Sequence, residues 1–292
     1  MKEITSLLYR KKAKNAIEAL WANPILEGVQ KAVSQKSSGP KGIILLYHNI
    51  VAEPPSNSAY FHKVCLTAAE FRRQMDYLAR HSRVISLSRY VAILGNASPK
   101  IPGSRPLVII TFDDGYRSVC TEAYPVLKQL GLPATLFVST GFIGKRTALP
   151  GEKPYPGVNY PKLSWEEIGE LAGDGFEIGS HTITHAHPGG STLAQYQDEI
   201  SRSASEIKSR IGIDPIHFSW PYGKRSPMLR TLEPFLRENG FISASYACGG
   251  KNTYSSNPYR LNRIGLSAGI SPTHFRRIAE GLSITDLLTR KK

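Results

Sequence analysis

Two segments of the chain place side chains that could carry out hydrolytic chemistry. In "VIITFDDGYRS", residues 108–118, Asp113 and Asp114 follow directly after an apolar run, and Gly115 allows a turn immediately after them. Two adjacent carboxylates at the end of a buried strand repel one another and lose their hydration. A bound cation would offset much of this penalty, because one carboxylate could ligate it while the other stays free beside it.

The second segment is "HTITH", which follows the apolar run "FEIGS" and contains His181 and His185, four residues apart. If these residues form a helical turn, both imidazoles face the same side and can bind one metal ion, with a carboxylate as the third ligand. The alternatives are an Asx-type turn leading to Gly115 for the aspartates, and a pair of hydrogen-bonded core histidines. Without a metal, both of these alternatives would have to apply at once, each at the end of a strand. We therefore expect a metal centre.

Seven apolar runs after residue 41 are the expected strands that position these side chains. Their continuous apolarity is typical of parallel strands that are covered on both faces. The runs are residues 42–47, 106–111, 133–139, 176–180, 216–220, 241–246 and 260–266. In α/β folds, chemistry gathers at the carboxyl ends of such strands, which is where Asp113 and Asp114 lie.

Helices are expected between these runs, because their starting signals are present. Capping-box spacing occurs at Thr67 with Glu70, Ser164 with Glu167 and Thr192 with Gln195, and a proline follows Ser226 and Ser271. The repeated units predict an α/β fold, namely a distorted (β/α) barrel of about seven strands. A doubly wound open sheet is the alternative, which periodicity does not separate from a barrel.

The ends and the long insertion of the chain lead to further expectations. Residues 1–40 are predicted to be a basic helical extension and linker, and residues 41–292 the catalytic domain. The extension could contact an anionic membrane, or pack on the main domain or on a second subunit. Residues 141–163, rich in Gly and Pro, are predicted to be either a lid or substrate wall or a disordered insertion.

The composition of the chain limits which binding partners and which cellular compartment are expected. The net charge of +14 favours an anionic partner, but the basic residues are scattered and no nucleic-acid-binding motif occurs, so nucleic acid is not expected. The three cysteines are widely spaced, which indicates reduced thiols. The first residues lack the apolar core of a secretion signal, and no 18-residue apolar span occurs. We therefore expect a cytoplasmic protein, peripheral at the inner membrane face if the extension binds lipid.

The motifs resemble those of the polysaccharide deacetylases of carbohydrate esterase family four, over about residues 40–275. The resemblance rests on "TFDDG" (111–115) and "SHTITH" (180–185), and more loosely on "FSWPYG" (218–223). The last motif, together with "LLYHNI" (45–50), looks most like the deacetylases of bacterial surface poly-N-acetylglucosamine. This resemblance implies a metal-dependent hydrolase that removes the N-acetyl group of an N-acetylated sugar or saccharide intermediate and releases acetate.

The resemblance also implies roles for individual residues. Asp113 corresponds to the general base, and Asp114, His181 and His185 correspond to ligands of a divalent metal ion. Zinc is the expected ion, with cobalt, nickel or manganese as alternatives; it would lower the pKa of a bound water and polarise the acetyl carbonyl. The backbone N–H of Tyr222 corresponds to the donor that stabilises the tetrahedral oxyanion.

Two departures from the family pattern affect the base and the acid. Ser219 stands where the family usually has an Arg that orients the base, which implies a base that is less tightly oriented. In the family, a late His protonates the leaving amine, and the only candidate in this chain is His274. The alternative is that His274 has no catalytic role and is simply exposed in the first turn of a helix. His48 could contact substrate or be hydrogen-bonded in the barrel mouth, and Trp220 could stack on a sugar ring or belong to the core.

Two other functions stay open at this point. An enzyme of the same fold could remove another small acyl group, such as formyl. A non-catalytic module that binds saccharide or membrane could retain the scaffold, but it would have no need of a base beside a metal site.

Overall fold

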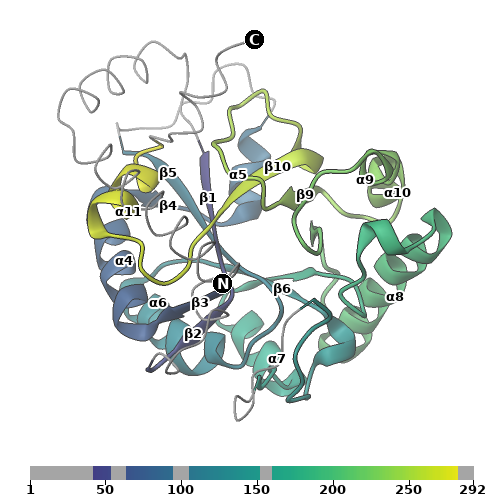
Figure 1. The fold of residues 1–292 in the computed structure, drawn as a ribbon, viewed down its shortest axis with the longest axis horizontal. Coiled ribbons are helices and arrows are strands. Elements are labelled where there is room, and N and C mark those ends of the chain that lie inside the picture. Colours follow the sequence, from purple (N-terminus) through teal and green to yellow (C-terminus); the bar gives the residue numbers. More distant parts are fainter. Residues whose placement is uncertain (1–41, 54–63, 95–104, 152–159, 282–292) are drawn as a thin grey trace, which may run out of the picture.

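Seven parallel strands form a closed ring in the computed structural model, which describes residues 42–53, 64–94, 105–151 and 160–281 (Figure 1). They are β1 (Gly42–Tyr47), β5 (Leu107–Phe112), β6 (Thr135–Val138), β7 (Glu177–Ser180), β8 (His217–Ser219), β9 (Ser243–Tyr246) and β10 (Leu261–Gly265). Their order around the ring is β1, β10, β9, β8, β7, β6, β5, and β5 pairs with β1 to close it. Each predicted run overlaps one of these strands, to within one residue at the end of β5, and the predicted barrel is confirmed.

Three further strands are only two or three residues long and were not predicted. They are β2 (Asn49–Val51), β3 (Cys65–Thr67) and β4 (Arg83–Val84). β2 pairs with β3 outside the ring, whereas β4 pairs with the amino end of β5 at Leu107 and Val108. Because β6 pairs with the same edge of β5 only near its carboxyl end, at Thr111 and Phe112, the ring is distorted between β5 and β6.

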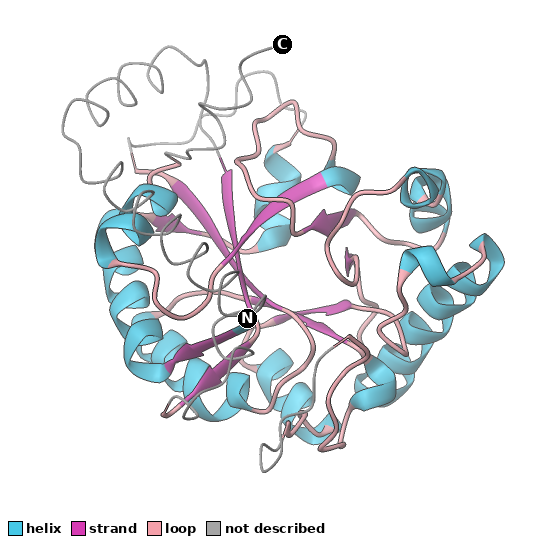
Figure 2. Cartoon of the chain, in the orientation of Figure 1, coloured by secondary structure: helices cyan, strands magenta, loops and turns pink. Residues whose placement is uncertain are grey.

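Helices surround the ring on its outer side (Figure 2). They are α4 (Ala68–His81), α5 (Leu87–Ile93), α6 (Tyr124–Leu130), α7 (Trp165–Gly173), α8 (Leu193–Ile211), α9 (Pro227–Thr231), α10 (Glu233–Glu238) and α11 (Pro272–Ala279), with short turns η1 (Val119–Ala123), η2 (Thr140–Phe142), η3 (Pro188–Gly190) and η4 (Pro258–Arg260). All three predicted capping boxes form, and the side chains of Ser226 and Ser271 cap helices that begin at a proline.

The alternation of side chains along β5 explains how the barrel positions the site. Val108, Ile110 and Phe112 join the apolar core between the strands and the outer helices. Leu107 and Ile109 face the other way and pack in a separate cluster that includes residues of β1, β6, β10 and α5, which fills the barrel interior toward its amino end. Since the side-chain period of a strand is two, Thr111 and Asp113 continue the inward-facing row at the carboxyl end.

Several predictions concern parts outside the described residues. The helical extension and linker of residues 1–40 cannot be compared with the structure, and neither can residues 152–159 of the long insertion. Within the described ranges, none of the helices has the length and apolarity needed to span a membrane.

Candidate active site

The aspartate pair lies on a tight turn at the carboxyl end of β5. The Asp113 N–H donates to the Tyr47 carbonyl at 3.0 Å, which continues the pairing of β5 with β1 and points the Asp113 side chain inward. Asp114 then has a φ of 75°, a left-handed conformation that is unfavourable for a residue other than glycine. Both carboxylates are buried, with residue exposures of 3% and 5%. The turn therefore directs two buried carboxylates to one rim.

The histidines lie on the loop that follows β7, and the helical turn considered for them does not form. Thr182 and His185 have φ values of 65° and 55°, so residues 181–185 form a strained loop instead. Two backbone bonds hold the loop against η2, from the Thr140 N–H to the Thr182 carbonyl and from the Gly141 N–H to the Ile183 carbonyl. A Cβ atom at Gly141 would lie 2.8 Å from the Ile183 oxygen, so only glycine fits there.

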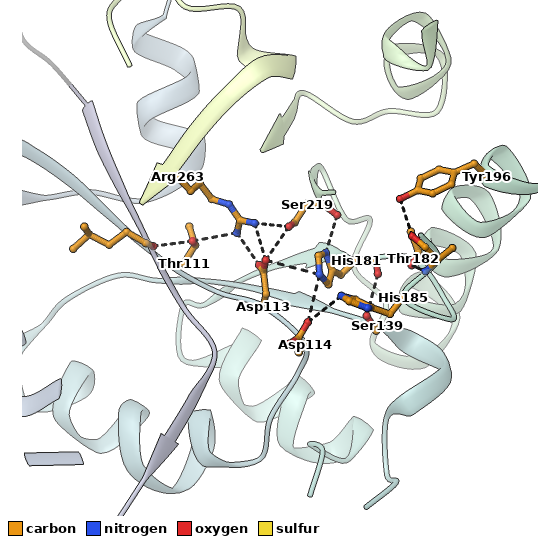
Figure 3. A network of polar contacts seen from close by, with 12 residues as sticks. Thr111, Asp113, Asp114, Ser139, His181, Thr182, His185, Tyr196, Ser219 and Arg263 are labelled. Carbon is orange, nitrogen blue, oxygen red and sulfur yellow. Dashed lines mark hydrogen bonds and ion pairs between the residues drawn. The ribbon is translucent and has the colours of Figure 1, made fainter. Parts of the chain in front are cut away.

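The loop still brings both imidazoles to Asp114 (Figure 3). Asp114 Oδ1 lies 3.4 Å from His181 Nε2 and 3.6 Å from His185 Nε2, and one ligand atom from each of the three residues lies within 4.8 Å of the others. Asp114 Oδ1 is buried without a hydrogen-bond partner. A buried, unpartnered carboxylate oxygen facing two imidazole nitrogens fits a divalent cation, because the cation would satisfy all three groups.

The protonation of the two imidazoles is set by their surroundings. His181 Nδ1 lies 2.7 Å from the Ser219 carbonyl, to which it can only donate, so Nε2 is the nitrogen that faces Asp114. Burial alone would lower the pKa of His181, but the carboxylates of Asp113 and Asp114 outweigh it and raise that pKa. Burial lowers the pKa of His185 to about 4, which keeps it neutral at pH 7 and able to bind a metal.

Asp113 is held by a buried arginine that the sequence interpretation missed. Arg263 Nη1 and Nη2 donate to Asp113 Oδ1 at 2.7 Å and to Oδ2 at 2.6 Å, and Arg263 is 0% exposed. The Ser219 hydroxyl donates to Asp113 Oδ2 at 3.1 Å and accepts from Arg263 Nη2 at 2.6 Å. The implication that Ser219 leaves the base loosely oriented is therefore wrong: the guanidinium comes from β10 instead of the third motif.

The electrostatics of both carboxylates follow from these contacts. Burial alone would raise the pKa of Asp113, but Arg263 and then His181 outweigh it and lower that pKa below its ordinary value. Burial would also raise the pKa of Asp114, yet the nearby imidazoles of His181, His48 and His185 outweigh it and lower that pKa strongly. Both groups are therefore ionised at neutral pH.

The third motif forms a turn beside His185. Tyr222 has a φ of 62°, and its ring centroid lies 4.8 Å from that of His185. Its hydroxyl donates to the Pro150 carbonyl at 2.8 Å, so the described part of the long insertion forms a wall next to the site. In the described residues, the positive φ angles outside glycine occur at Asp114, Thr182, His185 and Tyr222, all within the three motifs. Backbone strain is thus concentrated at the candidate site.

The remaining residues predicted to contact substrate or to act as the acid are Trp220, His274 and His48, and they lie in three different parts of the structure. Trp220 is 1% exposed and packs against Phe218 and Tyr246 in an apolar cluster, so of its two alternatives the core position holds and stacking on a sugar ring does not. His274 lies in the first turn of α11, where its N–H donates to the Ser271 hydroxyl. His48, between β1 and β2, is close enough for its charge to act on Asp113, Asp114 and His185.

Comparison with known proteins identifies relatives of the chain. The family model for polysaccharide deacetylases matches residues 100–241. YxkH of Bacillus subtilis (strain 168), whose name assigns it to the polysaccharide deacetylases, is 30% identical over 240 residues, which cover 82% of this chain and 76% of that protein. The poly-β-1,6-N-acetyl-D-glucosamine N-deacetylase of Escherichia coli (strain K12) is 25% identical over 162 residues, covering 42% of this chain and only 23% of that protein.

The solved structures agree in fold. Streptococcus pyogenes deacetylase PplD, in complex with acetate, superposes with a TM-score of 0.69 at 20% identity, over 83% of this chain and 100% of that chain. At that identity the likeness concerns the barrel alone, whereas the match to YxkH extends over most of both sequences. Because YxkH is 30% identical over 76% of its own length, and the family model covers all three motifs, the chain belongs to the polysaccharide deacetylase family.

Proposed function

We propose that the protein is a metal-dependent deacetylase that removes the N-acetyl group from an N-acetylated saccharide. The observation that carries the proposal is the convergence of Asp114, His181 and His185 around one point, with Asp113 buried beside them and paired with Arg263. The relative from Escherichia coli, named for its action on poly-β-1,6-N-acetyl-D-glucosamine, supports a substrate built from N-acetylglucosamine.

Asp114, His181 and His185 would hold the metal ion, and two imidazoles with one carboxylate suit zinc, with cobalt, nickel or manganese as alternatives. When bound, such an ion lowers the pKa of water and polarises a carbonyl oxygen. Asp113 would accept the proton of the attacking water on a carboxylate oxygen, since Arg263 and Ser219 keep that carboxylate ionised and fixed. The backbone N–H of Tyr222 is the proposed donor to the oxyanion.

His48 is the proposed acid that protonates the leaving amine. The sequence offered His274 for this role, but His48 is the histidine near enough to influence the pKa of Asp113 and of Asp114. The Nδ1 of His48 is also buried without a hydrogen-bond partner. We expect His48→Gln to lower kcat about 10²-fold and to remove the alkaline limb of the pH profile, because a general acid must be protonated to act. His274→Gln is the comparison, and the assignment fails if His274→Gln has the larger effect.

Acetate release from N-acetylglucosamine oligomers tests the function as a whole. We expect Asp113→Asn to retain the metal and lose at least about 10²-fold in kcat, whereas Asp114→Ala should lose the metal as well. Asp76→Asn, at a partly exposed ion pair on α4, is the matched carboxylate control. The assignment of the base fails if Asp113→Asn is as active as the wild type. Release of formate from N-formyl sugars, without release of acetate from the matched N-acetyl sugars, would show that formyl is the group removed.

A further inference from the structure

A glutamate on α8 binds the backbone of the histidine loop. Glu199 Oε2 accepts hydrogen bonds from the N–H groups of Ile183 and Thr184, at 2.8 Å and 2.9 Å, and its Oε1 accepts from the Thr184 hydroxyl at 2.8 Å. These three contacts occupy both carboxylate oxygens. All three donors lie between His181 and His185, the two imidazoles of the candidate metal centre.

The same helix also contacts the residue after His185. Tyr196, one helical turn before Glu199, donates its hydroxyl to the Ala186 carbonyl at 3.3 Å. Residues 184 and 186 are thus both tied to α8, and His185 lies between them. The position of its imidazole relative to Asp114 therefore depends on where α8 holds the loop (Figure 3).

The loop needs this support because its backbone is strained. Left-handed conformations outside glycine are unfavourable and persist only when the surroundings determine them. Two of these, at Thr182 and His185, flank the N–H groups that Glu199 binds. Without an acceptor at that place, two N–H groups would lose their partner and the loop could relax toward ordinary angles.

We propose that Glu199 is a positioning residue for the metal centre, which sets metal affinity by fixing the loop that carries His185. It acts through hydrogen bonds and does not itself ligate the ion. The inference rests on the proposed function, because it requires that Asp114, His181 and His185 bind a divalent metal.

Zinc titration of metal-free protein by calorimetry tests the proposal without relying on activity. We expect Glu199→Ala to raise the Kd for zinc by about 10–100-fold, as for other residues that orient metal ligands. Glu199→Gln should raise it less than Glu199→Ala, because the amide oxygen can accept both N–H groups while the amide nitrogen donates to the Thr184 hydroxyl. At saturating zinc, Glu199→Ala should regain most of its kcat.

Asp198→Asn is the matched control, since Asp198 is the adjacent residue on α8 and forms only an exposed pair with Arg202. It removes the same charge and should leave the Kd unchanged. The proposal is overturned if Glu199→Ala binds zinc as tightly as the wild type, or if Asp198→Asn weakens binding as much as Glu199→Ala does. If Glu199→Ala does not fold, Glu199→Leu, which keeps the side-chain volume, takes its place.

The titration also separates this inference from the proposed function. If the wild type binds no divalent metal, or if Asp114→Ala binds zinc as tightly as the wild type does, the metal centre itself is contradicted, and the inference with it. Wild-type protein that binds zinc through Asp114, with an unchanged Kd in Glu199→Ala, contradicts only the role of Glu199.

Discussion

The pairing of Asp113 with Arg263 places two opposite charges in contact in the barrel interior, where either charge alone would be costly to bury. An isolated buried carboxylate would protonate, and the bidentate guanidinium prevents this by stabilising the ionised form. The Ser219 hydroxyl bridges the two groups, so that a small residue in the third motif leaves room for an arginine from another strand. A general base is thus held ionised and in one orientation.

Replacing Arg263 by methionine tests this arrangement. The pKa of Asp113 should rise because burial is no longer opposed by the guanidinium, and the acid limb of the pH profile should move to higher pH, since the base works ionised. We expect at least a 10²-fold loss of kcat near pH 6, by the usual size of general base catalysis, and a loss of about 3–5 kcal/mol in the free energy of unfolding.

Arg260→Met, which breaks an exposed pair with Glu233, is the control for removing an arginine from this segment. It should change neither the pH profile nor, beyond about 1 kcal/mol, the stability. A pH profile of Arg263→Met that coincides with that of the wild type would refute the proposed link between Arg263 and the base.

At the scale of elements, a polar cluster joins the strands to α5 near the amino end of the barrel. Glu177 on β7 accepts hydrogen bonds from the N–H groups of Leu87 and Ser88 in the first turn of α5. His217 on β8 bonds to the Ser88 hydroxyl through Nε2 and to the Ser243 hydroxyl through Nδ1, both at 2.8 Å. Three strands and a helix are therefore linked through one buried imidazole.

This cluster predicts a loss of stability in mild acid. Burial lowers the pKa of His217 from 6.5 to about 4. The unfolded chain therefore binds a proton first as the pH falls, so the stabilisation is present above pH 6.5 and is lost as the pH falls toward 4. Between pH 7 and pH 5 we expect the free energy of unfolding to fall by about 2 kcal/mol through this residue.

Urea unfolding of the wild type and of His217→Gln at both pH values measures this contribution. The variant should be less stable at pH 7 but should lose about 2 kcal/mol less between pH 7 and pH 5. His81→Gln, at the exposed end of α4, should behave as the wild type does. Equal losses in the wild type and His217→Gln would show that His217 does not cause the pH dependence.

The elements that sequence predicts well are those with strong local signals. Strands buried on both faces, such as β1 and β5, appear as continuous apolar runs, and the capping boxes fix the starts of α4, α7 and α8. The two-residue β4 has no such run, because it pairs with only the amino end of β5. The loop after β7 has no local sequence signal for its shape, because its left-handed angles depend on contacts with η2 and α8.

At the scale of the whole molecule, the sequence indicated the four side chains of the site but not the residues that support them. Asp113 and Arg263 are 150 positions apart, and Arg263 lies in β10 close to Arg260, which is equally conspicuous in the sequence. Alternation along 260–266 is the signal that could have singled out Arg263, because it shares the inward face with Leu261. Glu199 lies on an amphipathic helix where a solvent-facing role is the ordinary expectation.

The net charge of the chain supports one further prediction, that the extension of residues 1–40 contacts anionic membranes. Full-length protein should sediment with vesicles that contain phosphatidylglycerol and not with vesicles of phosphatidylcholine alone, and sodium chloride at 0.5 M should release it. A second subunit as the partner of this segment would instead give a dimer in solution and no sedimentation with either kind of vesicle.

The origin of Arg263 in β10 limits how the chain can be divided. The family model ends at residue 241, so a protein trimmed to residues 100–241 would retain the three motifs at residues 111–115, 180–185 and 218–223. It would lack β1, β9 and β10, leaving β5 and β8 as open edges and Asp113 without its counter-ion. Engineering, chimera building and fragment expression therefore have to treat residues 42–281 as one indivisible unit.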